Sequence, residues 1–454
     1  IITEVHIYGI TIFPSDSLER FFDRLVGRRA NMEEIEDFLE DVVAYYKRAG
    51  YSLADFDTVN LKEDGVLEAK FNERAIEKIT FIGNNRTRNW MVRSYLLFKE
   101  GDIFNEKNLE ESVNRLYSTG LFRIVHYKIR EFGSGVEIIL IFEESEPGLL
   151  RVGVRYDLLS KNELSLSIVD KNIFGLATRF SAKCIYGERR NYFGVELVTD
   201  RLWKTHITTS FLASYRNKSL DIFDKSFKIL ELKEKRRGLT IRFGQHISRL
   251  GLFLVELSTE HITLKEFGNI RERYATHTLT FRSIVDSYDR AQFPTSGKYH
   301  TSYLKLSQNI LGSQTSYWQT FLLFESYYSF FRQYLSFHPR LSFGLSGGFL
   351  PLSETFALGD YAPFWGFRGG EIRGYSTLLT GIDIILNLPY NLHLLSGIVV
   401  GNAWGKKERV KFDELTWGYG AGVGIRTPAG PIKLLWGKNK LKRERLEFKV
   451  GFEF

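Results

Sequence analysis

Few residues of this 454-residue chain have the spacing that a catalytic or metal site requires. Residues 344–348 read Gly-Leu-Ser-Gly-Gly and match the G-x-S-x-G turn of serine hydrolases, but that turn joins a strand to a helix, and here it closes a long strand pattern. The nine histidines show no metal-binding spacing, and Cys184 is the single cysteine, so neither an internal disulfide nor a cysteine-based metal site can form. We therefore expect no enzyme, no catalytic role for Ser346, and no cofactor or metal.

A row of glycines at positions 418, 420, 422 and 424 alternates with larger residues such as Tyr419 and Val423. A dinucleotide-binding fingerprint would need a helix after the glycines, and no helical pattern follows. Glycine in a strand permits close approach of another backbone, so this row predicts a second segment packed against one face of the strand.

Arg373, Gly374 and Tyr375 form the most informative group of residues, in a loop over residues 349–377 that also contains Phe364 and Trp365. Arginine can contact a carboxylate through two parallel hydrogen bonds, glycine lets the loop approach a wall, and the aromatic ring can pack the turn. Because aromatic residues are unusual in a solvated loop, we predict that this loop folds into the interior of the protein. The alternative is an ordinary solvated Arg-Gly turn.

The elements that position this loop are strands, since the apolar period becomes 2 from residue 148 onward. In the last segment Leu446, Phe448 and Val450 alternate with charged residues, and many such segments reach about 10–14 residues, the length of tilted strands that cross a bilayer. The sequence predicts 16 strands, with residues 217–232 as an irregular extension. Polar residues inside and aromatic residues outside favour an antiparallel transmembrane barrel over a water-soluble sandwich.

Asp383 is the predicted partner of Arg373. It lies between Ile382 and Ile384, and the alternation directs its carboxylate into the barrel.

No apolar run approaches the ~18 residues of a membrane-spanning helix, which excludes a helical membrane protein.

Residues 1–147 have a different pattern, a β-α-α-β-β unit that occurs twice, over 1–74 and 75–147. In the first copy, apolar residues predict a helix that begins near residue 15 and includes Leu18 and Leu25. Asn31 and Gly50 are typical of the start and end of a second helix.

Charge also divides the chain, with a net charge of about −8 in residues 1–147 and about +16 in the remainder. A basic protein could bind nucleic acid, but the basic residues of the second part alternate with apolar ones and do not gather on helices. We therefore expect no nucleic-acid partner.

The two N-terminal units resemble polypeptide-transport-associated (POTRA) domains. The resemblance rests on "ITFIGNN", "LLFKEGDIFNEKNLEESVNRLYSTGLFRIVHYKI" and "VEIILIFEE" in the second unit, and on "YYKRAGY" and "DGVLEAKF" in the first. Another small α+β repeat is the alternative. The resemblance implies that extended polypeptide docks on an edge strand, where unpaired N–H and C=O groups are available.

The whole chain resembles the BamA/TamA-type outer-membrane assembly superfamily, in which an Arg-Gly-aromatic loop tip lies inside the barrel. The motifs that carry the resemblance are Arg373-Gly374-Tyr375, residues 401–404, residues 427–431, and a turn over 289–297 with Asp289, Arg290, Pro294 and Gly297. The resemblance implies an outer-membrane location with periplasmic POTRA domains. It also implies unfolded or exported polypeptides, outer-membrane lipid, lipopolysaccharide and periplasmic accessory proteins as partners.

Two positions depart from the family pattern. Val399 stands where relatives often have an acid, and Gly451, in the closing-strand signal with Phe452 and Phe454, is not at the expected spacing. The alternatives to an assembly factor are the membrane part of a patatin-like lipase and a secretion pore for one exoprotein. Because the chain begins at Ile1, a signal peptide, further POTRA domains or a lipase domain before that residue would decide among them.

Overall fold

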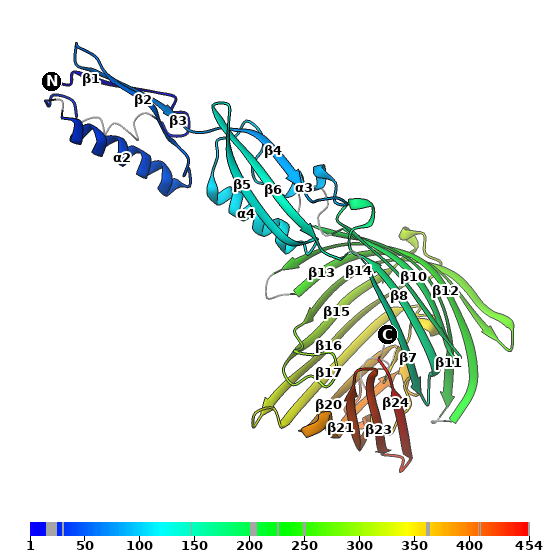
Figure 1. Ribbon diagram of the computed structural model, residues 1–454. Coiled ribbons are helices and arrows are strands. Elements are labelled where there is room, and N and C mark those ends of the chain that lie inside the picture. The colour runs from blue at the N-terminus through cyan, green and yellow to red at the C-terminus, as the bar shows by residue number, and fades with distance from the viewer. Residues whose placement is uncertain are drawn as a thin grey trace. The chain divides into compact units, whose positions relative to one another are not determined.

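The computed structural model describes residues 1–14, 25–29, 31–146, 148–199, 207–224, 227–247, 251–359, 364–406, 408 and 410–452. The chain divides into two compact units, which are Ile1–Pro147 with Lys171–Ala177, and Gly148–Asp170 with Thr178–Phe454 (Figure 1). None of the helices within the described ranges is both long and apolar enough to cross a membrane.

The N-terminal unit contains two small sheets, each of three strands. In the first sheet β3 (Val66–Asn72) lies between β1 (Glu4–Tyr8), to which it is parallel, and β2 (Asp55–Leu61), to which it is antiparallel. Helix α2 (Met32–Ala49) packs beside this sheet, begins at the N-cap Asn31, as predicted, and ends at Gly50 in the left-handed conformation. The predicted helix near residue 15, with Leu18, lies mostly outside the described residues.

The second sheet repeats this order, with β6 (Gly135–Glu144) between β4 (Ile76–Ile82) and β5 (Phe122–Phe132). Helices α3 (Asn89–Tyr95) and α4 (Glu106–Ser118) bury Val92, Leu109 and Leu116 against it. The predicted β-α-α-β-β plan is confirmed for this copy, and β5 is left as an edge strand.

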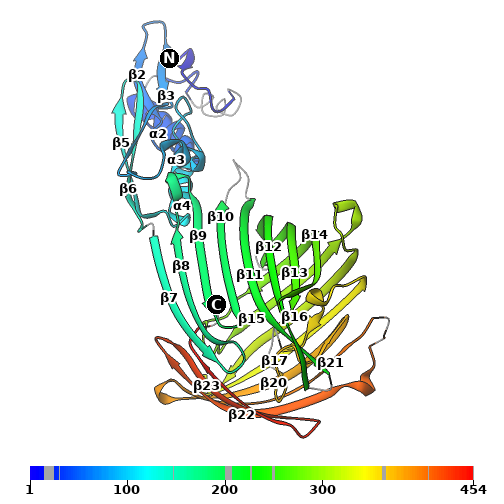
Figure 2. The same cartoon turned by 90° about the vertical axis from the view of Figure 1, so that its right-hand side faces the viewer.

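The C-terminal unit is a closed barrel of 16 strands, as predicted, and every neighbouring pair is antiparallel. The wall runs from β7 through β17 and then through β20 to β23 (Figure 2). The last strand, β24, pairs with both β23 and β7 and so closes the barrel. The strands are β7 (Gly148–Asp157), β8 (Lys161–Asp170), β9 (Thr178–Gly187), β10 (Arg190–Thr199), β11 (Thr208–Asp224), β12 (Phe227–Ile247), β13 (Gly251–Glu266), β14 (Asn269–Asp286), β15 (Gly297–Ser307), β16 (Tyr317–Phe330), β17 (Leu335–Gly348), β20 (Ser376–Leu388), β21 (Leu392–Trp404), β22 (Thr416–Thr427), β23 (Gly430–Asn439) and β24 (Glu444–Val450).

The two faces of the wall differ in chemistry, as alternation requires. On β20, Ile382 and Ile384 are 38% and 39% exposed on the outer face, whereas Asp383 between them is 6% exposed and faces inward. An apolar outer face with polar residues inside is the pattern of a transmembrane barrel.

One sequence prediction about the barrel was wrong. Residues 217–232 were expected to be irregular, but β11 and β12 continue through this region and pair as far as Asp224 and Phe227. The pattern of a membrane strand is hard to recognise there because the positions that alternate with the inward Leu220 and Leu232, such as Ser219, Asp221 and Glu231, are polar or charged. The inward Leu220 and Leu232 are buried together, which supports the regular ladder.

Candidate functional site

The loop between β17 and β20 packs inside the barrel. Phe364, Trp365 and Phe367 of the loop form a buried cluster with inward residues of the wall, including Leu379 and Val399. A short hairpin, β18 (Phe356–Ala357) with β19 (Arg373–Gly374), orders the two ends of the loop. The predicted inward fold of loop 349–377 therefore agrees with the described part of that loop.

The glycines of β22 explain how the loop can come so close to the wall. A Cβ atom on Gly418 would overlap the carbonyl oxygen of Trp365, and one on Gly420 would overlap the Trp365 ring. These two positions agree with the prediction that the row admits another backbone.

The Arg-Gly-Tyr segment is fixed by backbone contacts with the end of β21. The N–H of Tyr375 donates to the carbonyl of Trp404 at 2.7 Å, and a Cβ atom on Gly374 would overlap that same oxygen. The Tyr375 hydroxyl donates to the carbonyl of Leu350 at 3.0 Å. The Ser346 hydroxyl donates to the carbonyl of Tyr375 at 2.6 Å, so this serine serves the loop as a backbone anchor.

The predicted ion pair between Arg373 and Asp383 is corrected by the structure. Asp383 accepts from Trp365 Nε1 at 2.8 Å, and it lies 3.1 Å from Arg340 Nη1 and 3.3 Å from His338 Nδ1. The Arg340 side chain on β17 is only 1% exposed and needs a carboxylate, and Asp383 on the neighbouring strand supplies it. Within the described residues Arg373 forms no ion pair, and its Nε lacks a hydrogen-bond partner.

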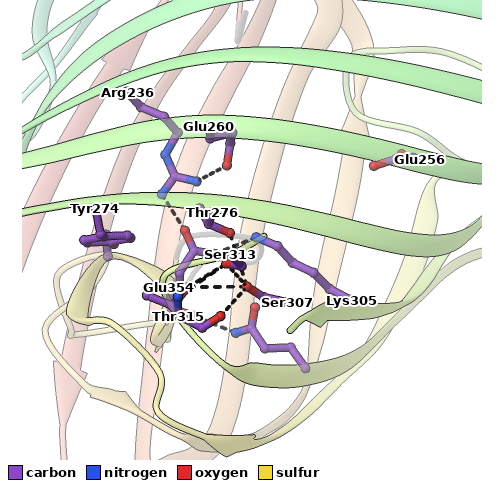
Figure 3. A network of polar contacts seen from close by, with 12 residues as sticks. Arg236, Glu256, Glu260, Tyr274, Thr276, Lys305, Ser307, Ser313, Thr315 and Glu354 are labelled. Carbon is purple, nitrogen blue, oxygen red and sulfur yellow. Dashed lines mark hydrogen bonds and ion pairs between the residues drawn. The ribbon is translucent and has the colours of Figure 1, made fainter. Parts of the chain in front are cut away.

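Sequence reasoning missed a second anchor of the loop, Glu354. Its carboxylate lies 2.6 Å from Arg236 on β12 and 2.6 Å from Lys305 on β15 (Figure 3). The exposed fractions of these side chains are 6%, 10% and 16%. Strand alternation places Arg236 and Lys305 inside the barrel, where each needs an acidic partner. The sequence signal for that partner was Glu354, an acid in a loop that is otherwise rich in apolar residues.

The turn over residues 289–297 joins β14 and β15 at the end of the barrel where β7 begins. Asp289 accepts hydrogen bonds from the backbone of Thr295 at 2.9 Å and of Ser296 at 3.2 Å. Burial raises the pKa of Asp289, but these bonds and the Thr295 hydroxyl outweigh it and hold the pKa below its usual range. Arg290 donates to the Thr295 hydroxyl at 2.9 Å.

Pro294 and Gly297 complete that turn. Gly297 has a φ of 107°, and a Cβ atom there would overlap the carbonyl of Ser287, so glycine is required. Pro294 follows Phe293, whose ring stacks on His393 of β21 at 4.0 Å. The turn therefore packs against the inner wall of the barrel at the end where β7 begins.

The barrel closes through a very short ladder. β24 pairs with β7 only at Lys449–Asp157 and Val450–Tyr156, whereas β23 and β24 form seven register pairs and β7 and β8 form ten. The ladder ends at Gly451, whose φ is 96° and whose Cβ atom would overlap the carbonyl of Val154. Phe452 follows with 37% exposure, and Phe454 lies outside the described residues. Residues 148–155 of β7 thus have no register partner on the described part of β24.

A cavity of about 690 Å³ lies inside the barrel beside this seam. Residues of β7, β8, β10, β11, β23 and β24 form one side, and the described loop residues Gly359, 364–367, Gly369 and Arg373 form the other. The seam, the lumenal loop and the cavity make up the candidate site.

Comparisons with known proteins agree with this architecture. Residues 172–454 match the family model of the Omp85 superfamily domain, and residues 75–145 match the POTRA family model, described as a surface antigen variable number repeat. The outer membrane protein assembly factor BamA of Nitratidesulfovibrio vulgaris is 22% identical over 344 residues, which cover 72% of this chain and 43% of that protein. BamA of Neorickettsia risticii is 23% identical over 145 residues, or 32% of this chain and 20% of that protein. The matches thus span less than half the length of each relative.

Solved structures share the fold. BamA from Haemophilus ducreyi lacking POTRA domains 1–3 matches with a TM-score of 0.73 at 17% identity, over 100% of both chains. CdiB from Acinetobacter baumannii matches with a TM-score of 0.55 at 12% identity, over 100% of this chain and 90% of that one. Both named curated relatives are assembly factors rather than enzymes.

Proposed function

Because the chain belongs to the Omp85 superfamily, we propose that it inserts or translocates other polypeptides at the bacterial outer membrane. The barrel spans that membrane, and the POTRA unit lies in the periplasm. The substrates are unfolded or exported polypeptides. Outer-membrane lipid and lipopolysaccharide surround the apolar outer wall, and periplasmic accessory proteins are further expected partners. We assign no catalytic residue and no cofactor.

The observation that carries the proposal is the short seam. Within the described residues two register pairs hold β24 to β7, so separation of these strands breaks far fewer of the described backbone hydrogen bonds than separation anywhere else in the wall. The free edge of β7 over residues 148–155 can then pair with an incoming extended segment, as exposed strand edges do. A new strand would therefore form on β7.

The POTRA unit offers a second edge for the same substrate. Strand β5 lies at the edge of the second sheet, is 11 residues long, and exposes Ile124, Tyr127 and Ile129 by 36–37% each. A long edge strand with exposed apolar side chains is suited to β-augmentation by an extended chain. Docking on β5 would deliver the substrate in strand conformation.

A disulfide across the seam tests the proposal. Tyr156 and Val450 lie opposite each other in register, so the pair Tyr156→Cys with Val450→Cys, in a Cys184→Ser background, can close the seam under oxidation. The protein is placed in liposomes with an unfolded outer-membrane barrel as substrate, and protease-protected substrate is measured over time. We expect insertion to stop on oxidation and to return on reduction.

The matched control places the disulfide within the wall. Val154 and Leu164 are opposite each other on β7 and β8, so Val154→Cys with Leu164→Cys adds a cross-link that leaves the seam free. This variant should insert substrate equally well when oxidised and reduced. Equal insertion by the oxidised and reduced seam variants would refute the seam route.

The secretion-pore alternative requires a route through the lumen. The loop is held across that route by the hydrogen bond from Trp365 to Asp383 and by the ion pairs of Glu354 with Arg236 and Lys305. The loop anchors therefore favour the seam over the lumen as the path of the substrate.

A further inference from the structure

The cavity beside the seam has an excess of positive charge. Among the described residues, eight basic and four acidic side chains line it, and this lining contains residues of both seam strands, such as Arg155 of β7 and Arg445 of β24. The Arg373 guanidinium reaches the same cavity from the loop. Charge of one sign in an enclosed space attracts ligands of the opposite sign.

Three of the four carboxylates that line the cavity, those of Glu163, Asp221 and Glu447, each contact two cations. Glu163 lies 2.8 Å from Arg190 and 3.6 Å from Arg155. Glu447 lies 3.2 Å from Arg445 and 3.4 Å from Lys449. Guanidinium donors remain unused, because the Nε atoms of Arg190, Arg216 and Arg373 are withdrawn from solvent and lack a hydrogen-bond partner.

Like charges also lie directly opposite each other in this part of the wall. Arg190 of β10 faces Lys218 of β11, and Arg216 of β11 faces Arg236 of β12. Directly opposed like charges destabilise an antiparallel pair. Glu234 lies 3.1 Å from both Arg216 and Arg236, and Glu163 lies 2.8 Å from Arg190, so carboxylates are the groups that separate these like charges in the wall.

Arg373 is held in place by its backbone. Its strand β19 pairs with β18, and the next residue, Gly374, is pressed against Trp404. No acid within the described residues lies within ion-pair distance of Arg373. It therefore presents a positioned cation to the cavity, and no carboxylate among the described residues forms an ion pair with it.

We propose that this cavity binds the carboxylates of an acidic segment of polypeptide at the inner face of the seam. This assignment rests on the function proposed above, because one end of a segment paired with β7 would lie beside Arg155, the residue of the unpaired part of β7 that lines the cavity. A polypeptide fits better than a lipid headgroup, since the cavity lies inside the wall, while the outer face of β7 carries the exposed Leu150, Val152 and Val154. The same arginines already bind carboxylates of this chain, so the ligand chemistry matches.

Peptide binding to the full-length protein in detergent tests the proposal. A fluorescent peptide with alternating Glu and Thr is compared by anisotropy with its Gln counterpart at low ionic strength. We expect the acidic peptide to bind about tenfold more tightly, which corresponds to ~1.4 kcal/mol. Arg373→Gln and Lys218→Gln should each remove most of that preference.

Arg282→Gln is the matched control, because Arg282 is an inward arginine of β14 that contacts Glu256 at 2.8 Å and does not line the cavity. It should leave the preference unchanged. Each variant is shown to be folded by faster migration of the unheated protein on denaturing gels. Equal binding of the two peptides, or the same loss in Arg282→Gln as in Arg373→Gln, would refute the proposal.

Competition identifies the source of the anion. If inorganic phosphate displaces the acidic peptide at an equal concentration of anionic groups, or if short-chain phosphatidylglycerol displaces it when the neutral lipid does not, the polypeptide assignment is overturned. Insertion in liposomes is measured on the same preparations. Active insertion without a preference for the acidic peptide refutes the cavity proposal alone, whereas acidic-peptide binding without insertion refutes only the function proposed above.

Discussion

Glu354→Gln should loosen the loop inside the barrel. The substitution keeps the shape of the side chain but removes the charge that lies 2.6 Å from both Arg236 and Lys305. With exposed fractions of 6–16%, these side chains are in the buried regime, where loss of one partner costs ~3–5 kcal/mol. Arg236 also lies 3.1 Å from Glu234 and 2.8 Å from Glu260, so the lower end of that range applies.

A loss of ~3 kcal/mol raises the population of the released loop by about 100-fold. Trypsin can measure this, because the loop contains Arg368 and Arg373, and cleavage of a transiently opened segment follows its population. The expected result is faster cleavage of the folded, unheated Glu354→Gln protein in the loop. Glu371→Gln is the control, since Glu371 lies in the same loop and accepts only a backbone hydrogen bond, from Arg368 at 2.8 Å.

A second substitution separates the ion pair from other effects of the change. Within the described residues Glu354 is the only acid at ion-pair distance from Lys305, so Glu354→Gln leaves this lysine buried and unpaired. Adding Lys305→Met should therefore slow cleavage relative to Glu354→Gln alone. If Glu354→Gln is cleaved at the wild-type rate, the anchor contributes nothing and the reasoning fails.

Four further outcomes follow from the same structure. The purified chain should run faster on unheated than on heated denaturing gels, because a closed barrel resists unfolding; identical migration would contradict the barrel. Asp383→Ala should lower the free energy of unfolding by ~3–5 kcal/mol, because it leaves Arg340 unpaired. Its effect on loop cleavage should add to that of Arg373→Ala, because Asp383 and Arg373 do not touch, and strong non-additivity would contradict this. Gly418→Val should displace Trp365 and cost ~1–3 kcal/mol, measured as faster loop cleavage. Burial raises the pKa of Glu73, but hydrogen bonds from Thr11, Ile12 and Tyr46 outweigh burial and lower this pKa. The ionised carboxylate therefore stabilises the folded state fully above the unfolded pKa of ~4.3, and this stabilisation is lost as pH falls through the folded pKa. Thermal melts of residues 1–147 should show a smaller loss of stability at acid pH in Glu73→Gln than in the wild type.

Much of the fold could be predicted from the sequence because period and length are local properties. The period of 2 after residue 148 and the even strand number both predicted the barrel, and the glycines at 418 and 420 indicated an approaching segment. Prediction failed at residues 217–232, where polar and charged residues such as Ser219, Asp221 and Glu231 occupy the outward positions that are apolar elsewhere in the wall.

The partners inside the lumen could not be predicted in the same way. Alternation gives the face on which Asp383 lies, but the path of the loop decides whether Trp365 or Arg373 reaches it. Arg340 reaches Asp383 from the neighbouring strand, and only the register of β17 with β20 shows this. The anchor at Glu354 depends on residues 118 and 49 positions away, Arg236 and Lys305, which no local pattern connects.

The contrast between the seam and the loop anchors supports the proposal that this barrel opens at the seam. Separation of β24 from β7 removes two register pairs, and at a net ~0.5–1.5 kcal/mol for each hydrogen bond this is a small barrier. Clearing the lumen would break the buried ion pairs of Glu354 and the hydrogen bond from Trp365 to Asp383. Breaking these contacts is costly because it leaves buried polar and charged groups without partners. The part of β7 without a register partner on the described part of β24 lies at the opening with the lower cost, and the basic cavity begins at Arg155, at one end of that part. A polypeptide that enters at the seam would therefore pair with the backbone edge of β7 before it contacts the lumenal cations. Pairing with β7 would thus fix the register of the polypeptide before the acidic side chains of that polypeptide bind the cations.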